Sequence, residues 1–126
     1  MKKLSVLIVD DSSVMRKIVE RSLRQAGLEL EKVVEAENGI DALKLVRAQM
    51  IDLILSDINM PKMDGIEFLR QLQSIDSTKM IPILMITTEG GEQKVMEAIS
   101  LGAKGYIRKP FSPDQVRQQV SEVLAQ

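Results

Sequence analysis

The sequence LSVLIVDD, residues 4–11, joins an apolar run to two adjacent carboxylates. Leu4–Val9 has the length and the Leu, Ile and Val content of a buried strand in a parallel sheet. The basic start Met1-Lys2-Lys3 resembles that of a secretory signal, but Asp10 and Asp11 end the apolar run too soon for one. The segment is therefore expected to be the first strand of a folded domain.

Short apolar runs of this kind recur along the chain, and a longer amphipathic segment follows each. This alternation is typical of a parallel sheet with right-handed helical crossovers. The sequence thus predicts an α/β fold of five consecutive βα units. The expected strands are Leu4–Val9, Val33–Ala36, Leu53–Leu55, Ile83–Ile86 and Gly105–Ile107.

The segments between these runs carry apolar residues at helical spacing. Ser12 or Ser13 is expected to cap the first helix and Gly27 to stop it, while Ser112-Pro113 opens the last. The apolar stripes expected to face the core are Met15, Ile18, Val19, Leu23 and Ala26; Ala42, Leu43, Val46 and Met50; Ile66, Leu69, Leu72 and Ile75; Val95, Met96 and Ile99; and Val116, Val120, Val123 and Leu124.

Composition limits both the architecture and the chemistry. With 126 residues, 44% of them hydrophobic, and no linker or repeat, residues 1–126 are expected to form a single domain. The chain has no cysteine and no histidine, which excludes disulfides, thiolate or Ser-His-Asp mechanisms and imidazole metal sites. The net charge of −1 signals no nucleic-acid partner, and no apolar run is long enough for membrane insertion. A cytoplasmic protein is expected.

Chemically useful side chains follow several of the expected strands. Asp10 and Asp11 follow the first, Asp57 the third, Thr87 the fourth and Lys109 the fifth. In open α/β sheets, ligands bind beyond the carboxyl ends of the strands, where these residues would meet. Three neighbouring carboxylates repel one another unless a cation is present, and hard oxygen ligands favour Mg²⁺. The sequence therefore predicts a divalent-metal site.

The residues alone leave more than one role open at each position. Asp57 beside Mg²⁺ either attacks phosphorus to form an aspartyl phosphate or serves only as a metal ligand. Asp10 and Asp11 are each either site residues or simple helix N-caps. Lys109 either pairs with Asp57 or is a solvated surface lysine. Thr87 either donates to a phosphoryl oxygen or merely suits a strand end.

Asp10-Asp11, the run DINMPKMDG at residues 57–65, Thr87 and Lys109-Pro110-Phe111 occur in the order and at the spacing of the response-regulator receiver family. Over essentially the whole chain the sequence resembles the single-domain CheY type of that family. The resemblance implies a doubly wound, flavodoxin-like, five-stranded parallel sheet of order 2-1-3-4-5, an order that CheY itself exemplifies.

The resemblance also implies a role for each acidic residue. Asp57 matches the phosphoacceptor. Asp11, Asp57 and the backbone carbonyl of Asn59 match the direct Mg²⁺ contacts, while Asp10 matches the acidic partner that acts mainly through water.

Other positions match the phosphoryl-binding and switching parts of the family. Lys109 matches the phosphoryl-binding lysine, and its bond to Pro110 matches a cis peptide. Thr87 matches the switch hydroxyl and Tyr106 the switch aromatic. Thr88 stands where chemotaxis members often have a smaller residue, and Gly90-Gly91 predicts a mobile loop beside it.

The implied function is a stand-alone response regulator of a two-component phosphorelay, of the chemotaxis type. It would take a phosphoryl group from a histidine kinase and assist its own phosphorylation and dephosphorylation, without being an enzyme in the ordinary sense. A downstream target, the flagellar motor or another signalling protein, would bind the face formed by the fourth helix, fifth strand and fifth helix. Candidate contacts on that face are Val95, Met96, Ile99, Tyr106 and Arg108.

Two other classes of function remain open. A Mg²⁺-dependent phosphatase or phosphotransferase would also use an Asp nucleophile, but it would usually place a second catalytic Asp two residues later, where this chain has Asn59. A purely structural interaction module with a vestigial site is the other class, and the complete set of acidic residues, threonine and lysine counts against it.

Overall fold

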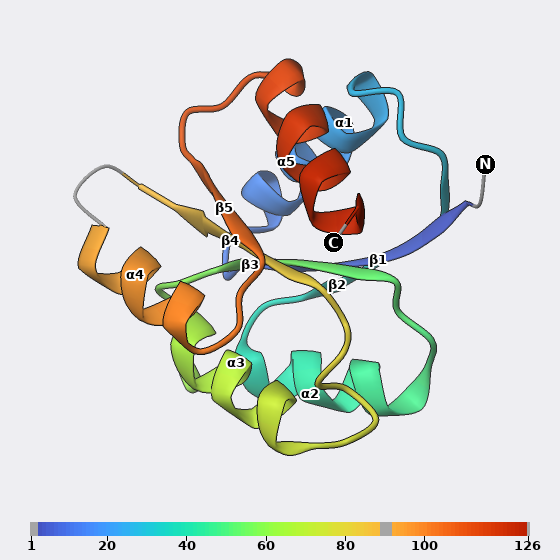
Figure 1. Cartoon of the computed structure of the whole chain (residues 1–126). Coiled ribbons are helices and arrows are strands. Elements are labelled where there is room, and N and C mark those ends of the chain that lie inside the picture. Colours follow the sequence, from blue (N-terminus) through green and yellow to red (C-terminus); the bar gives the residue numbers. More distant parts are fainter. Residues whose placement is uncertain (1–2, 89–91, 126) are drawn as a thin grey trace.

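The computed structural model of the chain describes residues 3–88 and 92–125, in which strands and helices alternate (Figure 1). The expected strands are all present, although β2 begins at Leu30 instead of Val33, and β3 and β4 extend through Asp57 and Thr87. The elements are β1 (Leu4–Val9), α1 (Ser13–Gln25), β2 (Leu30–Ala36), α2 (Gly39–Ala48), β3 (Leu53–Asp57), α3 (Gly65–Ser74), β4 (Ile83–Thr87), α4 (Glu92–Ser100), β5 (Gly105–Arg108) and α5 (Pro113–Ala125).

The strands form one parallel sheet of order β2-β1-β3-β4-β5, which confirms the expected flavodoxin-like topology. Val9, the last residue of β1, pairs with Ala36 and with Ser56. Farther along the sheet, Asp57 pairs with Ile86. All the strands run in the same direction, so their carboxyl ends lie along one edge and their loops meet there.

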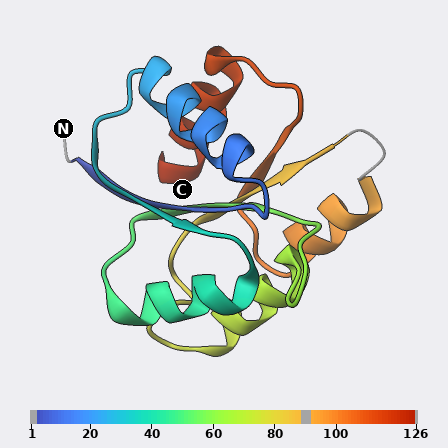
Figure 2. The ribbon, with the colours of Figure 1, turned by 180° about the vertical axis from the view of Figure 1, so that it is seen from behind.

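Helices cover both faces of the sheet, α1 and α5 on one and α2, α3 and α4 on the other (Figures 1 and 2). Successive side chains of a strand point to opposite faces, so each strand supplies both layers. In β1, for example, Val6 and Ile8 pack with the α1 and α5 side, whereas Leu7 and Val9 pack with the α2 and α3 side. The strands that lead to the site are thus packed on both faces.

Part of the predicted helix packing is wrong. Met50 lies beyond the end of α2 and is 86% exposed, and Phe68 of α3, absent from the predicted stripe, is fully buried. The predicted stripes were wider than the strip of each helix that contacts the sheet, so residues at their margins face solvent. The residues of the predicted stripes found exposed are Ile18, Met50, Met96, Ile99 and Leu124. For Met96 and Ile99, exposure is what the alternative placement on the target-binding face requires.

Side chains cap the first three helices. The Ser12 hydroxyl accepts a hydrogen bond from the Met15 N–H at 3.2 Å, which confirms one of the two expected caps of α1. Gly27 follows α1 with φ +87°, the left-handed conformation in which a glycine ends a helix at least cost. Asn38 caps α2 and Asp64 caps α3, each through its side-chain oxygen.

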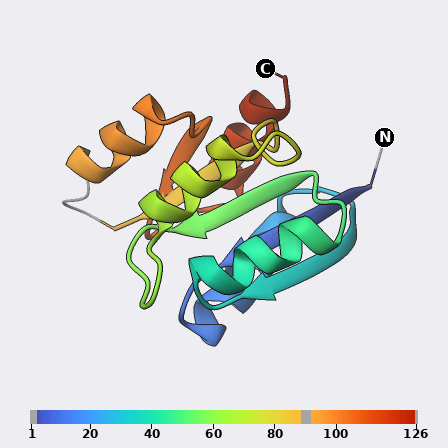
Figure 3. The ribbon, with the colours of Figure 1, turned by 90° about the horizontal axis from the view of Figure 1, so that it is seen from below.

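The two ends of the described chain lie at the edge of the sheet opposite the carboxyl ends of the strands (Figure 3). Leu4 at the start of β1 and Leu124 near the end of α5 line one surface hollow. Within residues 3–88 and 92–125, the structure has no helix with the length and apolar character that crossing a bilayer requires. Gly90-Gly91, the predicted mobile loop, lies outside the described residues.

Candidate functional site

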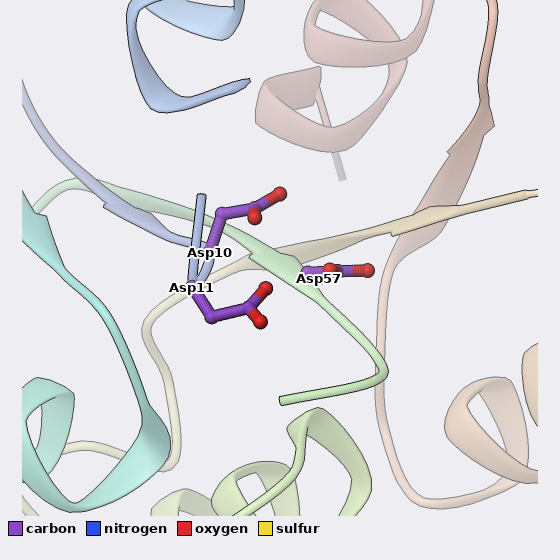
Figure 4. A group of neighbouring side chains, drawn as sticks. All are labelled: Asp10, Asp11 and Asp57. Carbon is purple, nitrogen blue, oxygen red and sulfur yellow. The ribbon is translucent and has the colours of Figure 1, made fainter. Parts of the chain in front are cut away.

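Three carboxylates meet where β1 and β3 end (Figure 4). Asp10 and Asp11 follow β1, Asp57 ends the neighbouring β3, and one oxygen atom of each lies within 4.8 Å of the others. Asp10 is 2% exposed, the Asp57 side chain is 13% exposed and Asp11 is on the surface. The cluster therefore runs from the core to solvent, with Asp57 accessible from outside.

Asp10 is fixed by several hydrogen bonds. Its carboxylate Oδ1 accepts the Ser12 N–H at 2.9 Å, and its own N–H donates to the Ala36 carbonyl at 3.0 Å. Its carbonyl accepts a hydrogen bond from Arg16 Nη1 at 2.6 Å. The alternative reading of Asp10 or Asp11 as the helix N-cap is wrong, because Ser12 holds that position.

Lys109 points into the acidic cluster. Its Nζ lies 3.4 Å from Asp10 Oδ2 and 3.9 Å from Asp57 Oδ2, and its side chain is 17% exposed. The backbone helps to hold it there, since the Lys109 N–H donates to the Thr87 carbonyl at 2.7 Å. The peptide bond between Lys109 and Pro110 is cis, as expected. Lys109 is therefore not a solvated surface lysine, and it contacts Asp10 more closely than the expected partner, Asp57.

The surroundings of Asp57 disfavour its charged form. Burial raises the pKa of Asp57 above its ordinary value, the Lys109 ammonium opposes this rise, and the Asp10 carboxylate adds to it. The Ile58 N–H donates to Asp57 Oδ1 at 2.8 Å, which steadies the charged form. A cation beside the three carboxylates would relieve the remaining repulsion.

The donor set fits Mg²⁺. The cluster offers carboxylate oxygens, which this hard cation prefers, and the chain has no histidine or cysteine to favour a softer metal. The exposed side of the site, where Asp11 lies, leaves room for the water ligands that Mg²⁺ usually keeps. Asn59, the other predicted ligand, lies on the surface two residues beyond Asp57.

A glycine allows the backbone after β3 to fold closely against Asp57. The Gly65 N–H donates to the Ile58 carbonyl at 2.8 Å. A Cβ atom on Gly65 would lie 2.2 Å from the Asp57 carbonyl oxygen and 2.9 Å from Ile58 Cα. No side chain fits between these backbone segments, so the start of α3 is held directly beneath the loop that follows Asp57.

The structure places Thr87 and Tyr106 on neighbouring strands, β4 and β5. Thr87 is buried, and its hydroxyl donates to the Thr88 carbonyl at 3.2 Å instead of to a group of the acidic cluster. Tyr106 is exposed and lines a groove of about 430 Å³ between α4 and β5 together with Val95, Met96 and Ile99. Thr88, the residue after Thr87, is exposed.

Sequence reasoning missed Arg16 as a residue of this site. Arg16 lies on α1, and it contacts both the Asp10 carbonyl and the Glu35 carboxylate of β2. An arginine on the polar side of an amphipathic helix gives no sign of which backbone carbonyl it will reach. One signal was available in the sequence. Arg16 comes four residues after the N-cap Ser12, so it lies one turn into α1 on the side of the site.

Comparisons with known proteins agree with this geometry. The family described as the response regulator receiver domain matches residues 6–121. The chemotaxis protein CheY1 of Helicobacter pylori is 39% identical over 122 residues, which cover 96% of this chain and 97% of that protein. A CheY homologue of Campylobacter jejuni is 36% identical over 122 residues, covering 96% of this chain and 92% of its own.

Solved structures give the same answer for the fold. The chemotaxis response regulator CheY4 of Vibrio cholerae has a TM-score of 0.83 and 38% identity, with 97% of this chain and 99% of that chain covered. Each similarity extends over nearly the whole length of both proteins. The chain therefore belongs to the response regulator receiver family of two-component signalling and is closely related to the CheY chemotaxis regulators.

Proposed function

We propose that this chain is a chemotaxis-type response regulator that accepts a phosphoryl group on Asp57 from the phosphohistidine of a histidine kinase. The observation that carries the proposal is the environment of the Asp57 carboxylate. It shares the sheet edge with Asp10 and Asp11, and Lys109 Nζ lies 3.9 Å from its Oδ2. A carboxylate with a cation on one side and metal-ligating oxygens on the other suits attack on phosphorus.

In the proposed transfer, an Asp57 carboxylate oxygen bonds to phosphorus while the phosphorus–nitrogen bond of the donor breaks. The imidazole nitrogen of the donor takes the electron pair, and the donor must be another molecule because this chain has no histidine. Lys109 offers its ammonium to a phosphoryl oxygen as a mobile point charge. Later, water reaching the exposed side of the site attacks phosphorus, the bond between phosphorus and the Asp57 oxygen breaks, and inorganic phosphate leaves the restored carboxylate.

Asp11, Asp57 and the Asn59 carbonyl would hold Mg²⁺, and Asp10 would act through a bound water. The ion would supply positive charge to offset that of the phosphoryl oxygens. Mg²⁺ binds carboxylates in their ionised form. One of the three, Asp10, forms an ion pair with Lys109, whose Nζ lies 3.4 Å from Asp10 Oδ2.

Thr87 and Tyr106 would turn this local charge into a change of surface. The phosphoryl group adds acceptor oxygens at the strand ends, and the buried Thr87 hydroxyl would leave the Thr88 carbonyl to donate to one of them. The space it vacates would admit Tyr106, which now lines the groove beside α4. A downstream protein, of the flagellar motor or of another signalling complex, would bind that altered face.

Intact-mass measurement after incubation with acetyl phosphate and Mg²⁺ tests the proposed acceptor. Wild type should gain the mass of one phosphoryl group, and Asp57→Asn should gain none. Phosphorylation of the Asn variant would place the chemistry elsewhere. Steady release of phosphate from free phosphate esters, with no phosphoryl group retained on the chain, would instead indicate the phosphatase class.

A phosphoryl mimic tests the switch separately. Adding beryllofluoride and Mg²⁺ to wild type should shift the amide signals of α4 and Tyr106. Thr87→Ala should still bind the mimic but lose much of that response. A ligand that binds both conformations of a protein equally well does not change their populations, and without the Thr87 hydroxyl the mimic should lose most of its preference for one of them. A full response in Thr87→Ala would exclude the threonine-to-tyrosine route.

A further inference from the structure

Arg16 of α1 joins the site to the edge of the sheet. Its Nη1 donates to the Asp10 carbonyl at 2.6 Å, and its Nε lies 2.7 Å from Glu35 Oε1 on β2. The side chain is 15% exposed, which is unusual for an arginine on a helix that faces solvent. Arg16 is therefore held in one place by two partners, the Asp10 carbonyl just beyond β1 and the Glu35 carboxylate on β2.

Glu35 is itself held on both of its oxygen atoms. Oε1 accepts from Arg16, and Oε2 lies 2.7 Å from Lys17 Nζ. The hydrogen bonds from Lys17 and Arg16 lower the pKa of Glu35, so it stays charged at neutral pH. Glu35 thus serves as a fixed anchor on β2 for the guanidinium.

The carbonyl that Arg16 holds belongs to the peptide group between Asp10 and Asp11. The parallel ladder between β1 and β2 ends at Val9 and Ala36, and the Asp10 N–H adds one further bond to the Ala36 carbonyl. Beyond that point the chain leaves the sheet, and Arg16 takes the place of a strand neighbour for the next carbonyl. Rotation of this peptide would carry the exposed Asp11 carboxylate away from Asp57.

We propose that Arg16 is a positioning residue that fixes the Asp10–Asp11 peptide so that the Asp11 carboxylate faces Asp57. This inference rests on the proposed function, in which Asp11 and Asp57 share the Mg²⁺. The planar guanidinium is suited to the task because it presents separate donors to the carbonyl and to Glu35 at fixed angles. Lysine would keep the charge but has a single nitrogen for both the Asp10 carbonyl and the Glu35 carboxylate.

Mg²⁺ titration followed by calorimetry compares wild type with Arg16→Met and Arg16→Lys. Groups that orient metal ligands typically change metal affinity by about 10- to 100-fold when lost, so both variants should bind Mg²⁺ at least about tenfold more weakly. Glu35→Gln, which keeps an acceptor for Nε, should lose less. Arg24→Met is the matched control, because Arg24 lies on the same helix but pairs with Glu20 on the surface.

The Asp11 amide signal gives a second readout that needs no metal. This N–H belongs to the peptide whose carbonyl Arg16 holds, so its chemical shift should move in metal-free Arg16→Met and Arg16→Lys but stay in place in Arg24→Met. An unmoved Asp11 amide in the Arg16 variants would overturn the inference. So would wild-type Mg²⁺ affinity in Arg16→Lys, which would show that charge alone suffices.

The two readouts separate this inference from the proposed function. If wild type fails to bind Mg²⁺, the proposed metal site is wrong for every variant, whereas the Asp11 amide still reports whether Arg16 holds the peptide. If Arg16→Met merely unfolds at lower denaturant while both its Mg²⁺ affinity and its Asp11 amide match wild type, Arg16 is a structural residue and the positioning role is excluded.

Discussion

At the scale of single residues, the position of Asp57 disfavours its charged form, first through burial and then through the neighbouring carboxylates. The residue sits between the core and solvent, beside Asp10 and Asp11, and Lys109 compensates only in part. A group placed in this way is stable as an anion when a cation is bound and is a source of instability without one. A cation bound at this cluster would therefore stabilise the folded protein.

Asp57→Asn should stabilise the metal-free protein at neutral pH and raise its melting temperature by a few degrees. Because the pKa of Asp57 is raised in the folded state from 3.8, folding favours its protonated form, and the ionised form costs stability above that raised pKa. The advantage of the variant should shrink as the pH falls toward 3.8. Thermal unfolding in a chelator measures this. Asp76→Asn, at a carboxylate that is 98% exposed, is the control and should change little.

Gly65→Ala should disturb the site through the backbone. Its Cβ would overlap the Asp57 carbonyl oxygen at 2.2 Å, and backbone atoms cannot yield as a flexible side chain can. Overpacking of this kind costs about 1–3 kcal/mol. Urea unfolding should show the loss, and Mg²⁺ affinity should fall with it. At Gly27 a Cβ meets no atom within 4 Å, so Gly27→Ala should lower stability through its positive φ but leave Mg²⁺ affinity unchanged.

At the scale of elements, the start of α2 is tied to the loop that follows Asp57. Asn38 is buried, and its Oδ1 accepts the Asp41 N–H at 2.9 Å at the start of α2. The next residue, Gly39, donates its N–H to the Met63 carbonyl in the loop that follows β3. The first turn of α2 thus supports the loop beyond Asp57.

Asn38→Ala should cost about 1–2 kcal/mol, near the upper end for loss of an N-cap, because the side chain is buried as well as capping. Ser12→Ala should cost less, about 0.5–1 kcal/mol, since the Ser12 cap of α1 is exposed. Urea unfolding with an unchanged slope would measure both. Equal losses would show that burial of Asn38 adds nothing to its capping role.

Sequence patterns predicted the positions of strands and helices better than the contacts that these elements make with one another. The five strands could be predicted because buried parallel strands are short and almost wholly apolar. Asp57 and Lys109 could be placed at the site because Asp57 is the last residue of β3 and Lys109 directly follows β5. Met96 and Ile99 were left with two possible places, the core and the target-binding face, since helical spacing shows a stripe but not how much of it a neighbour covers. Arg16 was missed because its partners, a backbone carbonyl and Glu35, are brought to it only by the fold.

At the scale of the whole molecule, one sheet contributes side chains to two separate apolar layers, one on each of its faces. Leu23 of α1 is fully buried in one layer and Leu72 of α3 is almost fully buried in the other. Every central strand contributes side chains to both, so neither layer can loosen without disturbing the strands beneath the acidic cluster.

Leu23→Ala and Leu72→Ala should each cost about 2–5 kcal/mol. In both variants, unfolding should remain a single transition, with the same midpoint by far-ultraviolet circular dichroism and by the fluorescence of Tyr106, the only tyrosine in a chain without tryptophan. Separate midpoints in either variant would show that the two layers unfold independently.

Leu4 and Leu124 line the same surface hollow, so the two ends of the described chain lie near each other. A short glycine-rich link could join those ends and leave the order of strands in space untouched, while a new opening at exposed Asp76 and Ser77 would lie at the same edge. Circular permutation of this kind would change which residue is made first without moving an atom of the acidic cluster. The chemistry of the site would then depend on how the strand ends are arranged in space and not on the order in which the strands follow one another in the sequence.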